Sequence, residues 1–391
     1  MITSIISEYN PFHNGHKYQI QKAREKGASH IVSIMSGNVV QRGDTAIYSK
    51  HFRARQALLG GADLVIELPA PFCISSAEGF AKNGVYIADA IGSDSLCFGC
   101  ECDDSELLYK ASEFSCRLSE SENGEESEIL KGFLKEGNSY PLALSKTAET
   151  LYNKQVAEIF KGPNNVLAIE YLKALNNTNM KSVPILRKGA DHDDNTLCGE
   201  FASASKIREL LKSGFIDESL LPYKADFSTI RDIKNMERGI LFSLNKMNRK
   251  ELIKVPDCNK DIADRIAKAL KVSKSYDELI FNTKTKAFTL ARIRRVIMYA
   301  VLGIRNSDFE LVPYARVLAF NDRGAEILSK AKGLSKIDIS TSLKELESKS
   351  ENNKRLARLD LITSNFALMC QKDLSDQPNE YSVKIQKTNI K

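Results

Sequence analysis

Along the first half of the chain, short apolar runs alternate with segments in which apolar residues recur every three or four positions. Short apolar runs are typical of buried strands, whereas the recurring spacing is typical of amphipathic helices. The strands are expected at residues 2–6, 30–35, 64–68, 95–98 and 183–186, with helices between most of them. Because strands that alternate with helices tend to lie parallel in one sheet, the pattern predicts a doubly wound α/β fold.

Beyond about residue 220 the pattern is mainly helical and carries little strand signal. We therefore expect two domains, a parallel-sheet domain at residues 1–220 followed by a mainly helical domain at residues 221–391. An acidic, serine-rich passage at residues 119–128 predicts an exposed turn or insertion in the first domain. Helical spacing follows it, at residues 130–135 and 142–160.

Two histidines follow the first predicted strand. His13 and His16 lie where a helix predicted over residues 17–26 begins. A helix N-terminus offers free N–H groups and partial positive charge, so histidines three positions apart can share one face there and donate to a phosphate. The simpler alternative is that one histidine caps the helix while the other packs in the core. The pairing of the two favours phosphate chemistry.

A second helix start, far downstream, has similar chemistry. Ser203 and Ser205 precede a helix with apolar residues at positions 207, 210 and 211. Their hydroxyls and the free amides can hold β- and γ-phosphates, and Lys206 and Arg208 add positive charge. For this segment alone, an ordinary N-cap followed by a solvated basic residue is the simpler interpretation.

The predicted loops at the carboxyl ends of the strands are the expected place for a ligand in such a sheet. They comprise residues 7–13, 36–44, 99–101 and 187–189. Both histidines belong to the first loop or the helix start that follows it. The sequence therefore predicts one phosphate-handling site where these four loops converge.

The two histidine and serine segments resemble known motifs. The sequence His-Asn-Gly-His at residues 13–16 resembles the HxGH motif of the nucleotidylyltransferase superfamily, which shares a Rossmann-like fold with class I aminoacyl-tRNA synthetases. Residues 203–208 are similar to that superfamily's ISSTxIR signature, with Ala204 in place of a second serine. Over most of its length the chain resembles the bacterial tRNA(Met) cytidine acetate ligases, at residues 8–16, 36–38, 41–43, 62–69, 98–101, 163–165, 187–189 and 289–295.

This resemblance implies an enzyme that acts in two steps. It activates acetate with ATP as an acetyl-adenylate, then acetylates the exocyclic amine of the wobble cytidine in elongator tRNA(Met), releasing pyrophosphate and AMP. His13 and His16 are the implied catalytic residues. The residues implied to bind ATP are Ser7, Glu8, Tyr9, Asn10, Pro11, Phe12, His13, Asn14, Gly15, His16, Lys17, Gly99, Asn164, Arg187, Ser203, Ser205 and Lys206. From the residues alone, Asn164 could equally serve only to cap a helix.

A basic helix predicted at residues 284–304 is the candidate tRNA contact. Its first part has five basic residues between Lys284 and Arg295 and no acidic ones. Helical spacing sets Arg292, Arg295 and Tyr299 opposite an apolar stripe, an arrangement that suits phosphate contact and base stacking. Charge alone favours an ordinary solvated face. With the resemblance, we assign tRNA binding to Lys284, Lys286, Arg292 and Arg295, and consider Lys50, Arg53 and Arg55 as further contacts to RNA or triphosphate.

Composition sets outer limits on these assignments. The 391-residue chain can bury a substantial core, and its 56 basic and 50 acidic residues give a net charge of +6, which is compatible with RNA but not diagnostic of it. We find no eighteen-residue apolar run and no uninterrupted apolar stretch at the N-terminus, so we expect no membrane association and a cytoplasmic protein.

No metal site is assigned from the sequence. Cys97, Cys100 and Cys102 lie close together, but Cys97 falls in a predicted buried strand, where cysteine serves as a small hydrophobe. Residues 191–194 read as an exposed polar loop rather than a metal site. Mg²⁺ is the usual companion of triphosphate chemistry, yet no dedicated carboxylate cage is evident, and Asp44 and Glu101 are the only candidates.

Two rival functions use the same motifs. A small-molecule nucleotidylyltransferase would need both phosphate motifs but not the basic helix, and a tRNA-binding module would use the nucleotide only for regulation. The sequence leaves open the general base, the acetate pocket, the tRNA nucleotides that are read and the oligomeric state.

Overall fold

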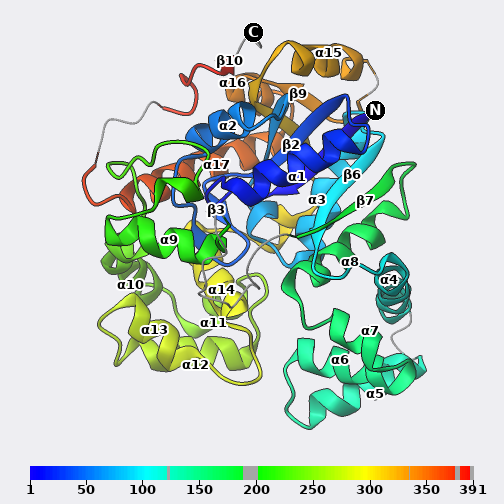
Figure 1. Ribbon diagram of the computed structural model, residues 1–391. Helices are drawn as coiled ribbons and strands as arrows, with labels where there is room; N and C mark the ends of the chain where they lie inside the picture. The colour runs from blue at the N-terminus through cyan, green and yellow to red at the C-terminus, as the bar shows by residue number, and fades with distance from the viewer. Residues whose placement is uncertain (121–123, 188–200, 334, 375–378, 388–391) are drawn as a thin grey trace.

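The computed structural model describes residues 1–120, 124–187, 201–333, 335–374 and 379–387 (Figure 1). Its centre is a sheet in the order β10-β8-β5-β2-β1-β6-β7. The five predicted strands are all present and parallel, as β1 (Ile2–Ser7), β2 (His30–Ser36), β5 (Leu64–Leu68), β6 (Ser95–Cys100) and β7 (Lys181–Leu186). The doubly wound α/β prediction is therefore confirmed.

The order of the parallel strands defines a switch point. The chain runs outward from β1 through β2 to β5 on one side, and then from β6 to β7 on the other. Neighbouring loops therefore diverge beyond the carboxyl ends of β1 and β6, which leaves a crevice there. Both predicted phosphate loops that follow these strands, at residues 7–13 and 99–101, lie at this point.

The C-terminal part returns to the sheet, which the sequence pattern did not predict. Strand β8 (Tyr314–Phe320) pairs antiparallel with β5, and β9 (Asp338–Ser340) and β10 (Gln386–Lys387) pair parallel with β8. The apolar run of β8 is interrupted by Arg316, which is buried in the structure. A separate two-stranded hairpin, β3 (Val39–Val40) and β4 (Asp44–Thr45), follows β2.

Helices cover both faces of the sheet. Helix α1 (Asn14–Glu25) and α2 (Lys50–Leu59) pack on one face, and α3 (Ala77–Ala90) and α8 (Pro163–Leu175) pack on the other. The remaining long helices of this part are α9 (Ala204–Ser213), α15 (Asp322–Ala331) and α17 (Glu351–Met369), with the short α16 (Leu343–Glu347) before the last of these.

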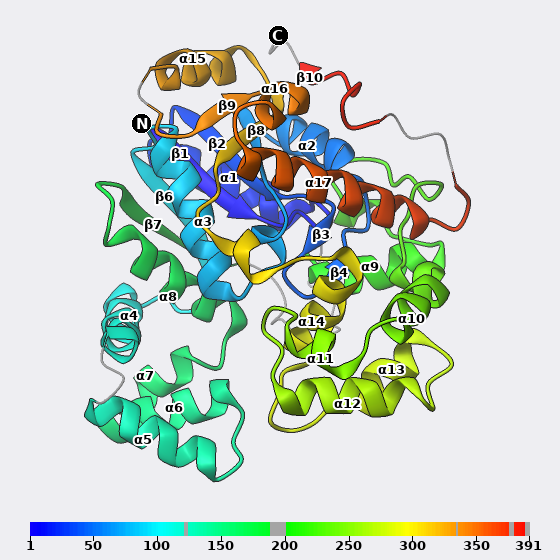
Figure 2. The same cartoon turned by 180° about the vertical axis from the view of Figure 1, so that it is seen from behind.

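Two helical lobes project from the same side of the sheet (Figures 1 and 2). One contains α4 (Ser105–Glu120), α5 (Glu125–Lys135), α6 (Tyr140–Leu151) and α7 (Lys154–Ile159). The other contains α10 (Glu237–Asn245), α11 (Arg249–Ile253), α12 (Lys260–Leu270), α13 (Tyr276–Thr283) and α14 (Leu290–Leu302). The helix predicted at residues 142–160 is divided because Asn153 caps a new helix there. Within the described part of the chain, no helix is both long and apolar enough to span a bilayer.

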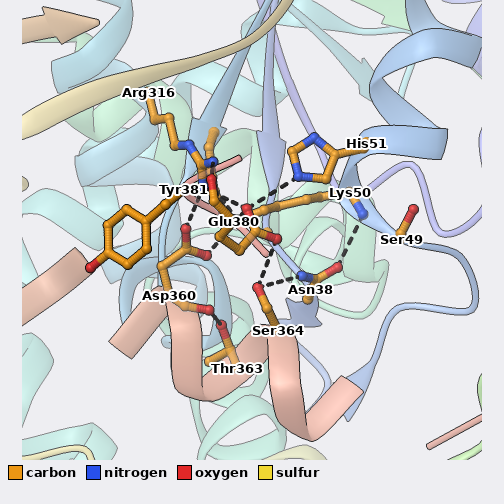
Figure 3. Close-up of polar contacts among 12 residues, drawn as sticks. Asn38, Ser49, Lys50, His51, Arg316, Asp360, Thr363, Ser364, Glu380 and Tyr381 are labelled. Atoms are coloured by element: carbon orange, nitrogen blue, oxygen red, sulfur yellow. Dashed lines mark hydrogen bonds and ion pairs between the residues drawn. The ribbon is translucent and has the colours of Figure 1, made fainter. Parts of the chain in front are cut away.

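A cluster of buried charges includes Glu67 of β5, and Figure 3 shows four of its members, Lys50, Arg316, Asp360 and Glu380. Lys50 Nζ lies 2.9 Å from Glu67 Oε1 and 3.2 Å from Glu380 Oε2. Arg316 Nη1 lies 2.6 Å from Asp360 Oδ2 and 2.8 Å from Glu380 Oε2. All five side chains are at most 8% exposed. The cluster therefore joins α2, β5, β8, α17 and the C-terminal segment.

Two cations face three carboxyl groups in this cluster, so protonation of one carboxyl would balance the charges of these five groups. Burial, reinforced by nearby Asp360, raises the pKa of Glu67 to about 7. Burial opposes the charge of Lys50, but the three surrounding carboxylates outweigh it and raise the pKa of that ammonium group. Below about pH 7 the cluster thus holds two cations, two carboxylates and one neutral carboxyl.

The same region holds the loop that follows β2. Arg53 donates through Nη1 to the backbone oxygens of Glu8 at 2.6 Å and Ser36 at 3.0 Å. Asn38 Oδ1 accepts from the backbone N–H of Lys50 at 3.0 Å. Lys50 and Arg53 are both 0% exposed, so the expectation that they contact RNA or triphosphate is wrong. They are structural cations that fix loops at the ligand-binding edge of the sheet.

Replacing Lys50 by methionine is expected to lower the free energy of unfolding by about 3–5 kcal/mol, because the surrounding buried carboxylates lose a cation. Lys22→Met is the matched control, since Lys22 pairs with Glu25 on the surface and the loss of that pair should leave stability nearly unchanged. Urea denaturation of both variants measures the difference. Equal effects of the two substitutions would contradict the structural role of Lys50.

Glu67 is expected to make stability fall as pH rises from about 5 to 8. Its native pKa is about 7, whereas an unfolded glutamate titrates at its ordinary, lower value. Between these values the native state holds a proton that the unfolded state has lost, so the free energy of unfolding decreases by at most about 1.4 kcal/mol per pH unit. Glu67→Gln should lack this component, which comparison of the two unfolding curves across this pH range measures.

Candidate active site

A cavity of about 380 Å³ opens at the switch point between β1 and β6. Its lining draws on all four loops that the sequence placed there. Among the predicted site residues it includes Ser7, Glu8, Tyr9, Asn10, His13, His16, Gly99, Asn164, Arg187 and Ser205. A smaller adjoining cavity shares His13, His16, Gly99 and Arg187 with the first and adds Gly15 and Ser203.

The two histidines form a capping box at the start of α1. His13 Nδ1 accepts from the backbone N–H of Gly15 at 3.0 Å, and His16 Nδ1 accepts from the backbone N–H of His13 at 3.2 Å. The ring centroids lie 3.9 Å apart. Because the box satisfies the first free amides, the helix begins at Asn14, three residues before the predicted start. Capping and lining the cavity are thus combined in the same two side chains.

These hydrogen bonds fix the tautomer of each ring. Since each Nδ1 accepts a hydrogen bond, a neutral imidazole must carry its hydrogen on Nε2. Burial, followed by the charges of Arg187 and Arg208, lowers the pKa of His13 to about 3. Burial, followed by His13, also lowers the pKa of His16 well below its ordinary value. Near neutral pH the two rings are therefore uncharged Nε2–H donors.

Neighbouring residues pack against the rings of His13 and His16. A Cβ atom on Gly15 would lie 2.8 Å from Cε1 of His13, so only glycine fits beside that ring. Tyr9 packs edge-on against His16 with ring centroids 4.8 Å apart, and its hydroxyl lies 2.9 Å from Ser33 Oγ. Phe12, which is fully buried, stacks on His16 at 5.7 Å.

Five of the residues predicted to bind ATP line neither cavity: Pro11, Phe12, Asn14, Lys17 and Lys206. Asn14 donates from Nδ2 to the backbone oxygen of Ser219 at 2.6 Å. Lys17 is exposed, and Lys206 Nζ pairs with Glu209 at 3.2 Å. These side chains support the motif or face solvent rather than the cavity.

Of the two cations predicted at the second phosphate motif, Lys206 and Arg208, only Arg208 lines the cavity. Arg208 lines the cavity, donating through Nη1 to the backbone oxygen of Asn10 at 2.7 Å and through Nη2 to Ser205 Oγ at 3.0 Å. Ser203 caps α9, because its hydroxyl accepts from the backbone N–H of Lys206 at 3.2 Å. Arg208 thus connects the histidine motif to the serine motif. The sequence predicted only that it would add positive charge.

Asn164 belongs to a polar chain at the rim of the cavity. Its Nδ2 donates to Glu101 Oε1, and its Oδ1 accepts from Arg187 Nη1 at 3.2 Å. The N-cap of α8 is Gly162, so the side chain of Asn164 does not cap that helix. Glu101, which sequence reasoning considered only as a metal ligand, therefore orients Asn164 and, through it, Arg187.

An apolar wall completes the cavity, and the sequence did not reveal it. It comes from β1, α3, β6 and α8, through the residues Ile6, Phe80, Phe98, Leu167 and Tyr171. The rings of Phe98 and Tyr171 lie 5.6 Å apart, and the Tyr171 hydroxyl donates to the backbone oxygen of Ile6 at 3.5 Å. No local pattern joins these residues, because they come from separate elements.

Helix α14 borders the same cavity through Ala291. The turn of the β3–β4 hairpin packs against it at Gly43, which has a φ of +73° and leaves no room for a Cβ atom beside the backbone of Arg294. Only glycine combines this backbone conformation with so close an approach. The helical lobe is thus in direct contact with the ligand-binding edge of the sheet.

The predicted outward face of α14 is wrong for two residues. Arg295 is 9% exposed and its Nη2 lies 2.9 Å from Asp257 Oδ2. Tyr299 is 2% exposed and donates to the backbone oxygen of Ile74 at 2.9 Å. Packing on both sides of the helix explains the error. Arg292 also pairs with Asp257, at 3.0 Å, but stays partly exposed, and Lys284 and Lys286 are exposed before the helix.

Metal-binding geometry is absent from the described residues, where no three His, Cys, Asp or Glu side chains are grouped to hold an ion. Of the two candidates, Asp44 Oδ1 accepts from the backbone N–H of Thr45 at 2.7 Å, and Glu101 is bonded to Asn164. The acidic stretch at residues 191–194 lies outside the described part of the chain.

Known proteins resemble this chain over most of its length. The family model described as HIGH Nucleotidyl Transferase matches residues 1–382. A tRNA(Met) cytidine acetate ligase of Clostridium kluyveri is 36% identical over 401 residues, covering 94% of this chain and 95% of its own. The ligase of the same name from Clostridium novyi is 38% identical over 363 residues, covering 86% and 89%.

Solved structures extend the likeness to the whole fold. Thermotoga maritima TmcAL superimposes with a TM-score of 0.91 at 26% identity, and a second structure of it, bound with alpha-thio ATP, superimposes with a TM-score of 0.87 at 25% identity. Each covers 100% of both chains. The chain therefore belongs to the HIGH nucleotidyl transferase family and, within it, to the tRNA(Met) cytidine acetate ligases.

Proposed function

We propose that this protein uses ATP to activate acetate as acetyl-adenylate and then acetylates N4 of the wobble cytidine of elongator tRNA(Met). The names of its relatives support the tRNA substrate and the ligase reaction, and the alpha-thio ATP bound to the Thermotoga protein supports ATP as co-substrate. The observation that carries the proposal is the pair of Nε2–H donors at the switch-point cavity.

In the first step a carboxylate oxygen of acetate attacks the α-phosphorus of ATP, and pyrophosphate leaves. Negative charge grows on the α-phosphate oxygens during this displacement, and preorganised donors stabilise it. We assign that role to Nε2–H of His13 and His16. Ser203, Ser205 and Arg208 would receive the leaving pyrophosphate, while Gly99, Asn164 and Arg187 would hold the nucleoside side of ATP. Mg²⁺ would enter with the triphosphate.

The apolar wall supports acetate as the acid that is activated. The methyl group of acetate needs an apolar surface beside the α-phosphate. Phe80, Phe98 and Leu167 provide such a surface in the cavity that the histidines line. Tight apolar walls discriminate against one extra methylene by about 1–3 kcal/mol. This wall would therefore exclude longer carboxylic acids by size.

The tRNA would reach the cavity along the α14 side. Ala291 borders the cavity, and exposed Lys284 and Lys286 precede that helix, with Arg292 partly exposed on it. We therefore propose a catalytic part at residues 1–220 and a tRNA-binding part at residues 221–391, whose last strands complete the shared sheet. A substrate of this kind implies a cytoplasmic protein.

The function is tested by incubating the protein with ATP, isotopically labelled acetate and elongator tRNA(Met), followed by nuclease digestion and mass spectrometry. Labelled N4-acetylcytidine at the wobble position is the expected product, with AMP and pyrophosphate formed in equal amount. Pyrophosphate release that does not depend on acetate, with unlabelled tRNA, would instead point to a nucleotidylyltransferase acting on a phosphorylated small molecule.

His13 has two roles that can be separated, the cap of α1 through Nδ1 and the proposed hydrogen-bond donor at Nε2. His13→Asn keeps a short side-chain acceptor for the α1 cap but removes the Nε2–H donor, so it should leave stability nearly unchanged and slow adenylate formation at least about 100-fold. His13→Ala should lose the same activity and also about 1 kcal/mol of stability. Acetate-dependent pyrophosphate exchange and urea denaturation measure the two effects. A fully active His13→Asn enzyme would contradict the donor role.

Shortening a side chain of the apolar wall enlarges the cavity and should change which carboxylic acid the enzyme prefers. Leu167→Ala is expected to raise activity with propionate relative to acetate by about 10-fold, because the longer acid can use the space of the lost side chain. Leu175→Ala is the control, since Leu175 is buried on the same helix and lines neither active-site cavity. Pyrophosphate exchange with each acid provides the ratio. An unchanged ratio in Leu167→Ala would place the acid elsewhere.

A further inference from the structure

Glu8 is the only carboxylate among the described residues that line the main cavity. The other residues lining this cavity include His13, His16 and Arg208, which suit phosphate. A carboxylate next to a triphosphate would be repelled by it. Direct contact with ATP therefore accounts for the histidines and arginines of this cavity but not for Glu8. The position of Glu8 therefore calls for a ligand that donates hydrogen bonds.

The side chain of Glu8 is held toward the hairpin rather than toward the histidines. Its Oε1 accepts from the backbone N–H of Gln41 at 2.9 Å, in the β3–β4 turn. Its own backbone oxygen is fixed by Arg53 Nη1 at 2.6 Å. The smaller cavity, which His13, His16 and Ser203 line, does not include Glu8. Glu8 thus lies in the part of the main cavity that the two cavities do not share.

That part of the cavity is also where the helical lobe meets the catalytic domain. Gln41 and Arg42 line it, Gly43 packs on the backbone of Arg294, and Ala291 of α14 completes its rim. If tRNA enters beside α14, as the proposed function requires, the cytidine enters a cavity in which Glu8 is the one carboxylate among the described lining residues.

Glu8 also lies within electrostatic reach of the acyl end of the cavity. Burial raises the pKa of the Tyr171 phenol, and the charge of Glu8 raises it further. Tyr171 belongs to the apolar wall assigned to the acetate methyl group. On the other side, burial lowers the pKa of Arg208, and the charge of Glu8 counteracts that effect. The charge of Glu8 therefore influences both a residue of the apolar wall and a cation of the second phosphate motif.

We propose that Glu8 binds the exocyclic amine of the target cytidine and accepts its proton during acetyl transfer. Carboxylates accept hydrogen bonds from cytosine N4, which presents donors only. The N4 lone pair forms a bond to the acetyl carbon, the bond from that carbon to the phosphate oxygen breaks, and AMP leaves with that electron pair. One N4 proton passes to Glu8, which later releases it to water. This assignment rests on the proposed function.

The test separates the two half-reactions. Glu8→Gln keeps an oxygen that can accept from Gln41 but is no longer a base, so acetate-dependent pyrophosphate exchange should stay within about threefold of the unchanged enzyme. Single-turnover acetyl transfer to tRNA should fall at least about 100-fold, as is typical for loss of a general base. Glu8→Asp, which retains a base on a shorter side chain, should transfer faster than Glu8→Gln.

Matched controls make each outcome decisive. Glu78→Gln removes an exposed carboxylate on α3 outside both cavities and should change neither half-reaction. Filter binding of tRNA should be equal in all variants. Equal losses in both half-reactions of Glu8→Gln would assign Glu8 to ATP binding. Acetyl transfer at the normal rate would contradict the proposal that Glu8 is the general base. If the unchanged enzyme forms no acetyl-adenylate, the proposed function fails, independently of Glu8.

Discussion

The buried charge cluster around Lys50 and Arg316 is the interaction on which the arrangement of this protein depends. Two cations and three carboxylates from five separate segments meet where water is excluded, so each charge needs its partners in place. The cluster ties the last strands and α17 to the parallel sheet. Helix α2, which carries Lys50, also carries Arg53, and Arg53 fixes the backbone oxygens of Ser36 and Glu8 at the edge where the ligand cavity opens.

The catalytic geometry follows from a simple local rule at the start of α1. Each histidine uses Nδ1 to accept from a backbone N–H of its own helix start, which leaves the hydrogen of the neutral ring on Nε2, and both residues line the cavity. Burial keeps both rings neutral. A pair of neutral donors can stabilise charge that grows in the transition state without binding the resting substrate as tightly as cations would.

Much of this could be predicted from the sequence, because strand and motif signals are local. The five parallel strands are short, mainly apolar runs that alternate with helical segments, and the histidine and serine motifs each lie within a few residues. Strand β8 was not predicted because the pattern beyond about residue 220 is mainly helical, and Arg316, which belongs to the charge cluster, interrupts the short apolar run of β8. The exposed face assigned to Arg295 and Tyr299 was wrong because helical spacing identifies one apolar stripe but not a second packed side.

Contacts between residues that are far apart in the sequence could not be predicted from the sequence. The apolar wall joins four elements, and Arg208 rather than Lys206 reaches the cavity because of how α9 is rotated against the first loop. The part played by Glu101 in orienting Asn164 likewise depends on the packing of α8 beside β6. Such contacts are set by tertiary packing, for which local periodicity carries no signal.

The tautomers of His13 and His16 are the central claim of this account, and nitrogen-15 NMR of histidine-labelled protein measures them directly. The chain has only five histidines, and single substitutions such as His13→Asn assign their signals. We predict that both rings are neutral, carry their hydrogen on Nε2 and do not titrate between pH 5 and pH 8. A ring protonated at Nδ1, or an imidazolium near pH 7, would contradict the proposed mechanism.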